Sequence, residues 1–137
     1  MTQDSDSAFV AQIDAFIDVI LGRKAYDLVV LDVRKLTTIA DAFVLCSGRS
    51  NRQVSAIAAH VHEQMKAQGI YPLSVEGKSE GHWVLLDYGH VIIHVFYEPV
   101  RAFYDLEGLW RDAGHMQTPA LEKAQEQNAK EDAIDDR

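Results

Sequence analysis

Cysteine is almost absent from this chain, which has one such residue in 137 positions. A single cysteine excludes an internal disulfide, so a hydrophobic core must hold the fold together. Cys46 ends the apolar run 43–46, and no basic residue stands within that run. The sequence therefore predicts a buried thiol that packs as a small hydrophobic side chain, not a reactive nucleophile.

Long apolar runs are missing as well. No stretch approaches the roughly 18 residues that a bilayer span requires. Residues 1–7 are polar and acidic, whereas a secretory signal would begin with basic and continue with apolar residues. We expect a soluble, cytoplasmic protein with no membrane partner.

Basic residues are scarce, with 13 Lys and Arg against 21 Asp and Glu and a formal net charge of -8. Binding to phosphates requires an excess of Lys and Arg along one surface, so this charge opposes binding to free nucleic acid. A basic protein surface is a better expectation for the partner. The hydrophobic share of 47% and the length of 137 residues are typical of one globular domain.

The periodicity of apolar residues predicts helices at 8–21 and 52–68, with Asp6 or Ser7 as the N-cap of the first. A third helix is expected from Pro99 to Gly114, because apolar residues recur on one helical face there. Short apolar segments predict five strands, at 28–33, 42–47, 73–76, 83–86 and 91–96. This order predicts an α/β (α+β) fold in which helices flank a mixed five-stranded sheet.

Residues 115–137 contain few apolar side chains, with Leu121 and Ile134 as the only large aliphatic ones. So little apolar surface does not offset the entropy lost on ordering a segment. The sequence therefore predicts one domain over 1–114 and a disordered acidic tail over 115–137.

The histidines do not predict a metal site. His90 and His94 would share one face of a strand but lie about 13 Å apart at roughly 3.3 Å per residue, too far for one ion. His60 and His62 on a helix would point in different directions. We expect no metal and no cofactor, and a hydrogen-bonded His94.

The segment 47–50, Ser-Gly-Arg-Ser, lies between a predicted strand and a predicted helix. Such a turn can hold a phosphate on backbone N–H groups, as in nucleotidyltransferases. Those enzymes also need paired carboxylates to bind magnesium. Asp87 stands alone at a strand end, and Arg34 occupies the position where Asp32 would need an acidic companion. A structural turn is therefore favoured over a nucleotide site, and we expect no catalytic activity.

The segment 83–88 begins with Trp83, ends with Tyr88 and has Asp87 beside the second aromatic ring. Trp and Tyr are enriched at the centres of protein interfaces, and a neighbouring acid suits a basic partner. Aromatic residues on a sheet are equally often part of the core. The composition leaves both interpretations open.

A series of short motifs recurs in this chain in the order and spacing of a known family, over about residues 8–114. They are the segments 31–33 (LDV), 39–41 (IAD), 46–48 (CSG), 52–54 (RQV), 75–77 (VEG), 83–89 (WVLLDYG), 91–96 (VIIHVF) and 104–110 (YDLEGLW). Together they resemble the ribosomal silencing factor (Iojap) family. His90 stands where the family commonly has Asp, and Gly108 replaces a residue that is usually charged.

The resemblance implies a fold similar to that of nucleotidyltransferases but without their catalytic carboxylates. It implies a translational repressor that binds the large ribosomal subunit through ribosomal protein fourteen and blocks joining of the small subunit when nutrients are scarce. Assistance in large-subunit assembly, or less favoured nucleotidyltransferase-like catalysis, are the alternatives, and a monomer or a homodimer is possible. The implied docking residues are Trp83, Val84, Leu85, Leu86, Asp87 and Tyr88. On that basis Trp83→Ala is expected to abolish binding and leave the fold intact.

Overall fold

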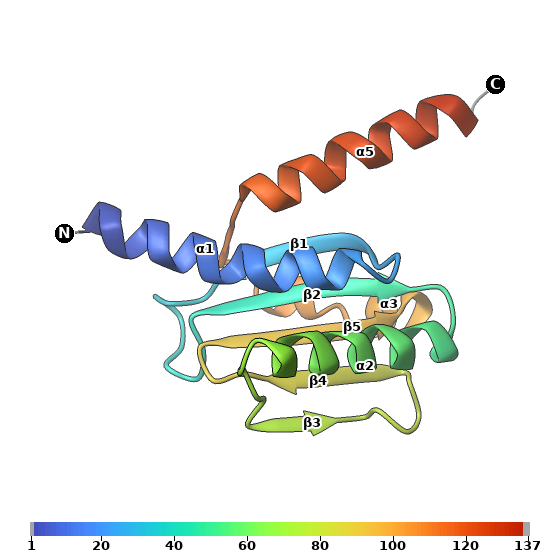
Figure 1. The fold of residues 1–137 in the computed structure, drawn as a ribbon, viewed down its shortest axis with the longest axis horizontal. Helices are drawn as coiled ribbons and strands as arrows, with labels where there is room; N and C mark the ends of the chain where they lie inside the picture. Colours follow the sequence, from blue (N-terminus) through green and yellow to red (C-terminus); the bar gives the residue numbers. More distant parts are fainter. Residues whose placement is uncertain (1, 136–137) are drawn as a thin grey trace.

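The structure is a computed structural model that describes residues 2–135 of the chain, with side chains described over 6–127. Its strands form one sheet, and helices pack against that sheet (Figure 1). In chain order they are α1 (Thr2–Leu21), β1 (Tyr26–Asp32), β2 (Ala42–Gly48), α2 (Asn51–Ala67), β3 (Ser74–Glu76), β4 (Trp83–Asp87), β5 (Val91–Tyr97), α3 (Glu98–Tyr104), α4 (Leu106–Leu109), β6 (Gly114–His115) and α5 (Pro119–Asp135).

The sheet has six strands in the order β3-β4-β5-β2-β1-β6. The pair β2 and β5 is parallel, and every other neighbouring pair is antiparallel. The mixed α/β fold predicted from the sequence is confirmed. The sixth strand, β6, was not predicted because two residues are too few to produce an alternating pattern; it pairs His115 with Leu31.

The main core lies between the sheet and the helices α1 and α2, which cover the same face (Figure 1). The predicted apolar stripe of α1 is confirmed, because Ile13, Ile17 and Ile20 have no exposed surface. Cys46 on β2 is also fully buried, and burial raises the pKa of its thiol to about 12. The prediction of a buried thiol is thus confirmed.

The start of α1 differs from the sequence-based expectation. The helix begins at Thr2, so neither Asp6 nor Ser7 is its N-cap. The polar residues of the first turns carry no apolar periodicity, which is why the pattern did not include them. Asp6 instead forms an ion pair with Arg34 at 3.1 Å, and the Arg34 guanidinium lies 4.2 Å from the centroid of the Phe9 ring.

The single helix predicted from Pro99 to Gly114 is wrong, because the chain breaks it into α3 and α4 at Asp105. Asp105 has a left-handed backbone (φ 47°), and its carboxylate accepts a hydrogen bond from the Gly108 N–H at 3.1 Å. A Cβ on residue 108 would collide with this carboxylate. Phe103 and Leu109, two of the apolar residues in this segment, are exposed to solvent.

The disordered tail predicted over 115–137 also differs from the structure, in which residues 119–135 form α5. Leu121 and Ala124 are buried, and the Thr118 hydroxyl accepts a hydrogen bond from the Leu121 N–H at 3.1 Å. Two small apolar contacts and one cap fix the first turns of α5 near α1, while its later turns extend away from the sheet (Figure 1). Among the described residues, no helix is long and apolar enough to cross a membrane.

Candidate functional site

Strand β4 divides its side chains between two environments, because successive residues of a strand point to opposite faces. Val84 and Leu86 are completely buried in the main core beneath α1 and α2, and Tyr88 after the strand is 7% exposed. Trp83, Leu85 and Asp87 lie on the opposite face and are partly exposed. Of the six residues predicted to dock a partner, only these last three present side chains on the outer face.

Trp83 is held firmly although part of its surface is exposed. Its ring stacks on Phe96 at a centroid distance of 4.8 Å, and it lies 5.3 Å from the ring of Tyr104. Its indole N–H donates a hydrogen bond to Nδ1 of His94 at 3.1 Å. The predicted hydrogen bond of His94 is confirmed. Trp83 is therefore packed on one side and exposed on the other. The sequence left core and interface open as alternatives, and the position of Trp83 is compatible with both.

His94 supports this arrangement as a neutral acceptor. Burial lowers the pKa of its imidazole to about 4, so the ring is neutral at neutral pH. A neutral ring has one unprotonated nitrogen, and the hydrogen bond from Trp83 assigns that acceptor to Nδ1. The ring of Phe43 contacts it edge-on at 5.3 Å. The orientation of Trp83 is thus fixed by a buried group on the neighbouring strand β5.

Two aromatic residues of α3 extend the exposed apolar surface beside Trp83. Tyr104 is 58% exposed and Phe103 is 81% exposed, and their rings contact each other at 5.1 Å. We name the set of Trp83, Leu85, Asp87, Phe103 and Tyr104 the Trp83 surface. The sequence analysis missed Phe103 and Tyr104 because it placed this segment in one continuous helix; the signal that could have found the break was Asp105 three residues before Gly108.

A hollow of about 270 Å³ adjoins the Trp83 surface. Gly77 allows the β3–β4 turn to close beside it, because its φ is 83° and a Cβ there would collide with the Trp83 carbonyl oxygen. Glu80 is part of the lining and adds a negative charge at the end of β4 where Trp83 lies. The hollow is lined by Gly77, Glu80, His82, Trp83, Val100 and Tyr104.

Asp87 also has a local structural role. Its carboxylate accepts a hydrogen bond from the Gly89 N–H at 2.8 Å and so stabilises the β4–β5 turn. A substitution that removes this acceptor would alter the turn as well as the charge. The loss of charge can be separated from the loss of the acceptor only with an amide at this position.

The turn formed by residues 47–50 uses its polar groups within the protein. The Ser50 hydroxyl accepts from the Gln53 N–H at 3.1 Å and caps α2, while the Arg49 N–H donates to the Gln53 side chain at 2.6 Å. Ser47 is 1% exposed, and its hydroxyl accepts from Arg101 at 2.8 Å. These contacts favour the structural turn over a phosphate site.

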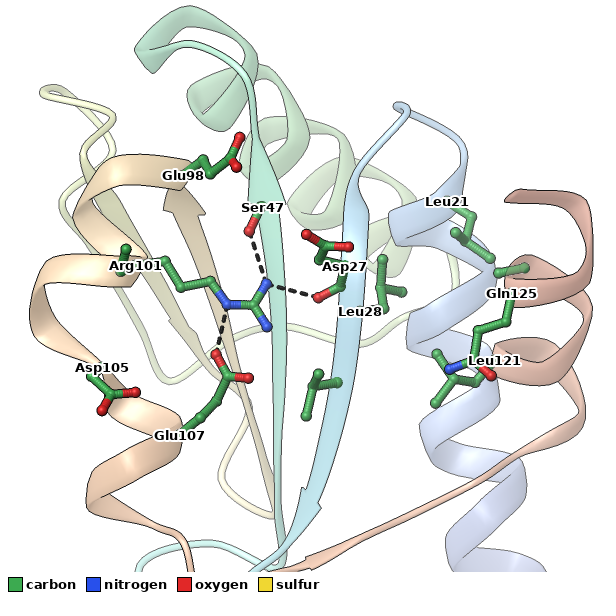
Figure 2. A pocket seen from close by; sticks show the side chains of 13 residues that line it. Leu21, Asp27, Leu28, Ser47, Glu98, Arg101, Asp105, Glu107, Leu121 and Gln125 are labelled. Carbon is green, nitrogen blue, oxygen red and sulfur yellow. Dashed lines mark hydrogen bonds and ion pairs between the residues drawn. The ribbon is translucent and has the colours of Figure 1, made fainter. Parts of the chain in front are cut away.

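A second hollow of about 480 Å³ lies beside this turn, between α3, β1 and α5 (Figure 2). Figure 2 shows Arg101 reaching from α3 across its floor. Beyond Ser47, the guanidinium donates to the Asp27 carbonyl oxygen at 2.7 Å and to the Glu107 carboxylate at 2.8 Å. Arg101 thereby joins α3 to β1 and β2.

The carboxylates around this hollow do not form a magnesium site. Glu107 is paired with Arg101, Glu98 accepts from the Tyr26 hydroxyl, and Asp105 accepts from the Gly108 N–H. Among the side chains that the structure describes, residues 6–127, no three His, Cys, Asp or Glu come together in an arrangement that could hold a metal ion. The arrangement is that of a junction between elements.

Comparisons with known proteins identify one family for most of the chain. The family described as "Ribosomal silencing factor during starvation" matches residues 6–137. A ribosomal silencing factor of Bacillus subtilis is 42% identical over 91 residues, which are 66% of this chain and 77% of that protein. A crystal structure from Chromobacterium violaceum superposes with a TM-score of 0.70 at 35% identity, covering 82% of this chain and 88% of that one.

A more distant relative is named for assembly of the ribosome and not for silencing. The mouse protein "Mitochondrial assembly of ribosomal large subunit protein 1" is 29% identical over 101 residues, which are 72% of this chain and 44% of the mouse protein.

Proposed function

This chain belongs to the ribosomal silencing factor family, and we propose that it represses translation by binding the large ribosomal subunit and blocking access of the small subunit. The partner in this proposal is ribosomal protein fourteen, which the resemblance of the motifs implies. Repression is steric and requires no catalysis. The observation that carries the proposal is the Trp83 surface, where a firmly held tryptophan adjoins two exposed aromatic rings.

The Trp83 surface has the composition of a binding hot spot. Large aromatic side chains lose little entropy on binding, and a residue already packed in the free protein loses less still. Trp83 is packed on Phe96 before any partner arrives. Asp87 and Glu80 place negative charge at the rim, which complements a basic ribosomal protein.

The proposal is tested by a double substitution, Phe103→Ala with Tyr104→Ala. Both side chains are mostly exposed, so we expect an unchanged melting temperature. If they contribute to a hot spot, the loss is about 2 kcal/mol or more, which lowers the affinity for purified large subunits roughly thirtyfold. Tyr71→Ala is the matched control, because Tyr71 is 62% exposed and precedes β3 outside the Trp83 surface.

Two outcomes would count against the proposed surface. One is a double variant that binds large subunits as tightly as the unchanged protein. The other is an equal loss in Tyr71→Ala, because then the effect is not specific to the Trp83 surface. A second variant, Tyr88→Phe, should bind normally, since the Tyr88 ring packs on Phe16 in the main core at 4.9 Å.

Assistance in large-subunit assembly is the second candidate function, favoured by the name of the mouse relative. It would use the same Trp83 surface on a precursor of the subunit. The two functions differ in when loss of the protein has an effect. If the protein assists assembly, cells that lack it should accumulate large-subunit precursors during rapid growth. If it represses translation, cells that lack it should continue to translate during starvation.

A further inference from the structure

Four basic residues gather at one end of this acidic molecule, although its net charge is -8. They are Arg23, Lys24, Arg49 and Arg52, and all four are exposed. Over the described part of the chain, the ion pairs involve only Arg34 and Arg101 as cations. We propose that this basic end contacts phosphates of ribosomal RNA while the Trp83 surface contacts the protein partner, an inference that rests on the proposed function.

The side chain of Gln53 joins the two turns that carry these residues. Its amide nitrogen donates to the Lys24 carbonyl oxygen at 3.3 Å, and its amide oxygen accepts from the Arg49 N–H at 2.6 Å. The α1–β1 turn and the β2–α2 turn are therefore neighbours, although about 25 positions separate them in the sequence. The two turns form one charged surface, which we name the basic end.

The remaining two members lie beside the same bridge. His60 on α2 lies so close to Gly22 that a Cβ on Gly22 would meet its Nε2 at 2.8 Å, which places Arg23 next to α2. Arg52 stands in the first turn of α2, which contains no acidic residue. The positive end of the helix dipole therefore adds to the field of the four side chains.

The carboxylates nearest to the basic end do not neutralise it. Glu98 accepts a hydrogen bond from the Tyr26 hydroxyl, and the Arg49 guanidinium lies over the Tyr26 ring at 4.8 Å. Asp27 is the other acid close to Tyr26. Over the described residues, neither Glu98 nor Asp27 forms an ion pair with any of the four cations. The 77–81 turn, which contacts the first turn of α2 at Gly81, adds Lys78 and Glu80, one charge of each sign.

The register of the sheet places the basic end near the Trp83 surface. Tyr26 pairs with Ser47, Ser47 with Phe96, and Phe96 with Trp83, so the four residues form one row across the sheet. Tyr26, whose ring lies under the Arg49 guanidinium, and Trp83 are three strand spacings apart in this row, about 14 Å at 4.8 Å per spacing. When a partner protein is bound at Trp83, the groups that surround this partner on the ribosome therefore lie close to the basic end.

Ribosomal RNA is the occupant that this chemistry favours. Proteins at the surface of a ribosomal subunit are surrounded by RNA, and unpaired Arg and Lys side chains bind phosphate oxygens without regard to sequence. The acidic remainder of the chain repels the same RNA. The basic end would then orient the protein on the subunit, although it is too small to bind free RNA tightly.

The test compares the triple variant Arg23→Gln, Arg49→Gln, Arg52→Gln with a matched control, Lys35→Gln, Lys66→Gln, Lys123→Gln. The control changes three exposed cations outside the basic end. Affinity for purified large subunits is measured between about 50 and 200 mM salt, and the logarithm of the affinity is plotted against that of the salt concentration. Affinity for isolated ribosomal protein fourteen is measured in parallel.

We expect the triple variant to reduce the salt slope by about 2 to 3, because each lost phosphate contact removes roughly 0.7 to 0.9. Its affinity at low salt should fall more than tenfold on the subunit and less than twofold on the isolated protein. The control should change neither. Arg49→Lys with Arg52→Lys should keep the salt slope, which shows that charge and not a folding defect is responsible.

An unchanged salt slope on the large subunit would overturn the RNA contact. An equal loss on isolated ribosomal protein fourteen would also overturn it, because the basic end would then face an acidic protein surface. Failure of the unchanged protein to bind isolated ribosomal protein fourteen contradicts the partner in the proposed function, and the salt slope on the subunit still decides the RNA contact.

Discussion

Trp83 and His94 show how one hydrogen bond ties a surface residue to the core. The Trp83 N–H donates to a buried imidazole that is itself surrounded by aromatic rings. The sequence predicted a hydrogen-bonded His94, and the resemblance of the motifs implied a docking role for Trp83. The sequence did not predict their pairing, since the residues are 11 positions apart and meet only through the β4–β5 register.

This pairing changes what Trp83→Ala is expected to do. The sequence-based expectation was an intact fold, but the substitution removes a stacked ring and leaves the Nδ1 of His94 without its donor. Both losses destabilise the fold. A loss of binding in Trp83→Ala could therefore come from a destabilised fold. The binding of the exposed double variant, Phe103→Ala with Tyr104→Ala, must be measured in parallel. For the same reason Asp87→Asn, which keeps the acceptor for Gly89, is preferable to a charge reversal.

The buried imidazole of His94 predicts a stability that depends on pH. Its pKa is about 4 in the folded protein, against an ordinary value of 6.5. Between these values the unfolded chain takes up a proton that the folded protein does not. Stability is therefore fully present above about pH 6.5 and decreases as the pH falls toward 4, by on the order of 3 kcal/mol.

The measurement is denaturant unfolding of the unchanged protein and of His94→Gln between pH 7 and 4.5. Gln keeps an acceptor for Trp83 but does not titrate, so the variant should show a flatter curve. A hydrogen bond from Arg34 lowers the pKa of Asp32 below 3.8. The titration of this carboxyl therefore changes the stability only below the measured range of pH 7 to 4.5. Parallel curves for the two proteins would show that His94 is not the group responsible.

Among the elements, those with long apolar patterns were predictable and those fixed by single contacts were not. The stripe of α1 and the fully buried β2 are visible in the sequence because many residues repeat one preference. The division between α3 and α4 depends on the carboxylate of Asp105, and the start of α5 depends on Thr118 and Leu121. Individual contacts of this kind leave no periodic signal. The exposed aromatic residues of α3 were missed as a consequence.

Deletion of residues 116–137 tests the role of α5. It removes Leu121, which is 3% exposed and packs in the main core. Burial of one Leu contributes about 1.5 to 3 kcal/mol, so we expect the melting temperature to fall by roughly 5 to 10 °C. Affinity for large subunits should change less than tenfold, because α5 packs against α1 and lies beside β1, which is three strands from β4.

The point substitution Leu121→Ala is the control for this deletion. It should lower the melting temperature in the same direction while the rest of α5 stays in place. A truncated protein that melts normally would show that α5 does not support the core. A truncated protein that is folded but binds more than tenfold less tightly would give α5 a binding role.

At the scale of the whole molecule, the sequence predicted the class of fold and not the arrangement of its surfaces. The order of helices and strands was sufficient to predict a mixed sheet with flanking helices, and the motifs were sufficient to identify the family. The basic end draws its residues from two turns and the start of α2, and the Trp83 surface draws its residues from β4 and α3. Such sets form only when the sheet register brings distant segments together.

The central claim is that the bound protein keeps the ribosomal subunits apart. Purified large and small subunits are mixed with magnesium, with and without a saturating amount of this protein, and their joining is followed by sedimentation. We expect the protein to remain with the large subunit and joined ribosomes to decrease, and the Phe103→Ala, Tyr104→Ala variant to restore joining. Undiminished joining while the protein sediments with the large subunit would contradict the account.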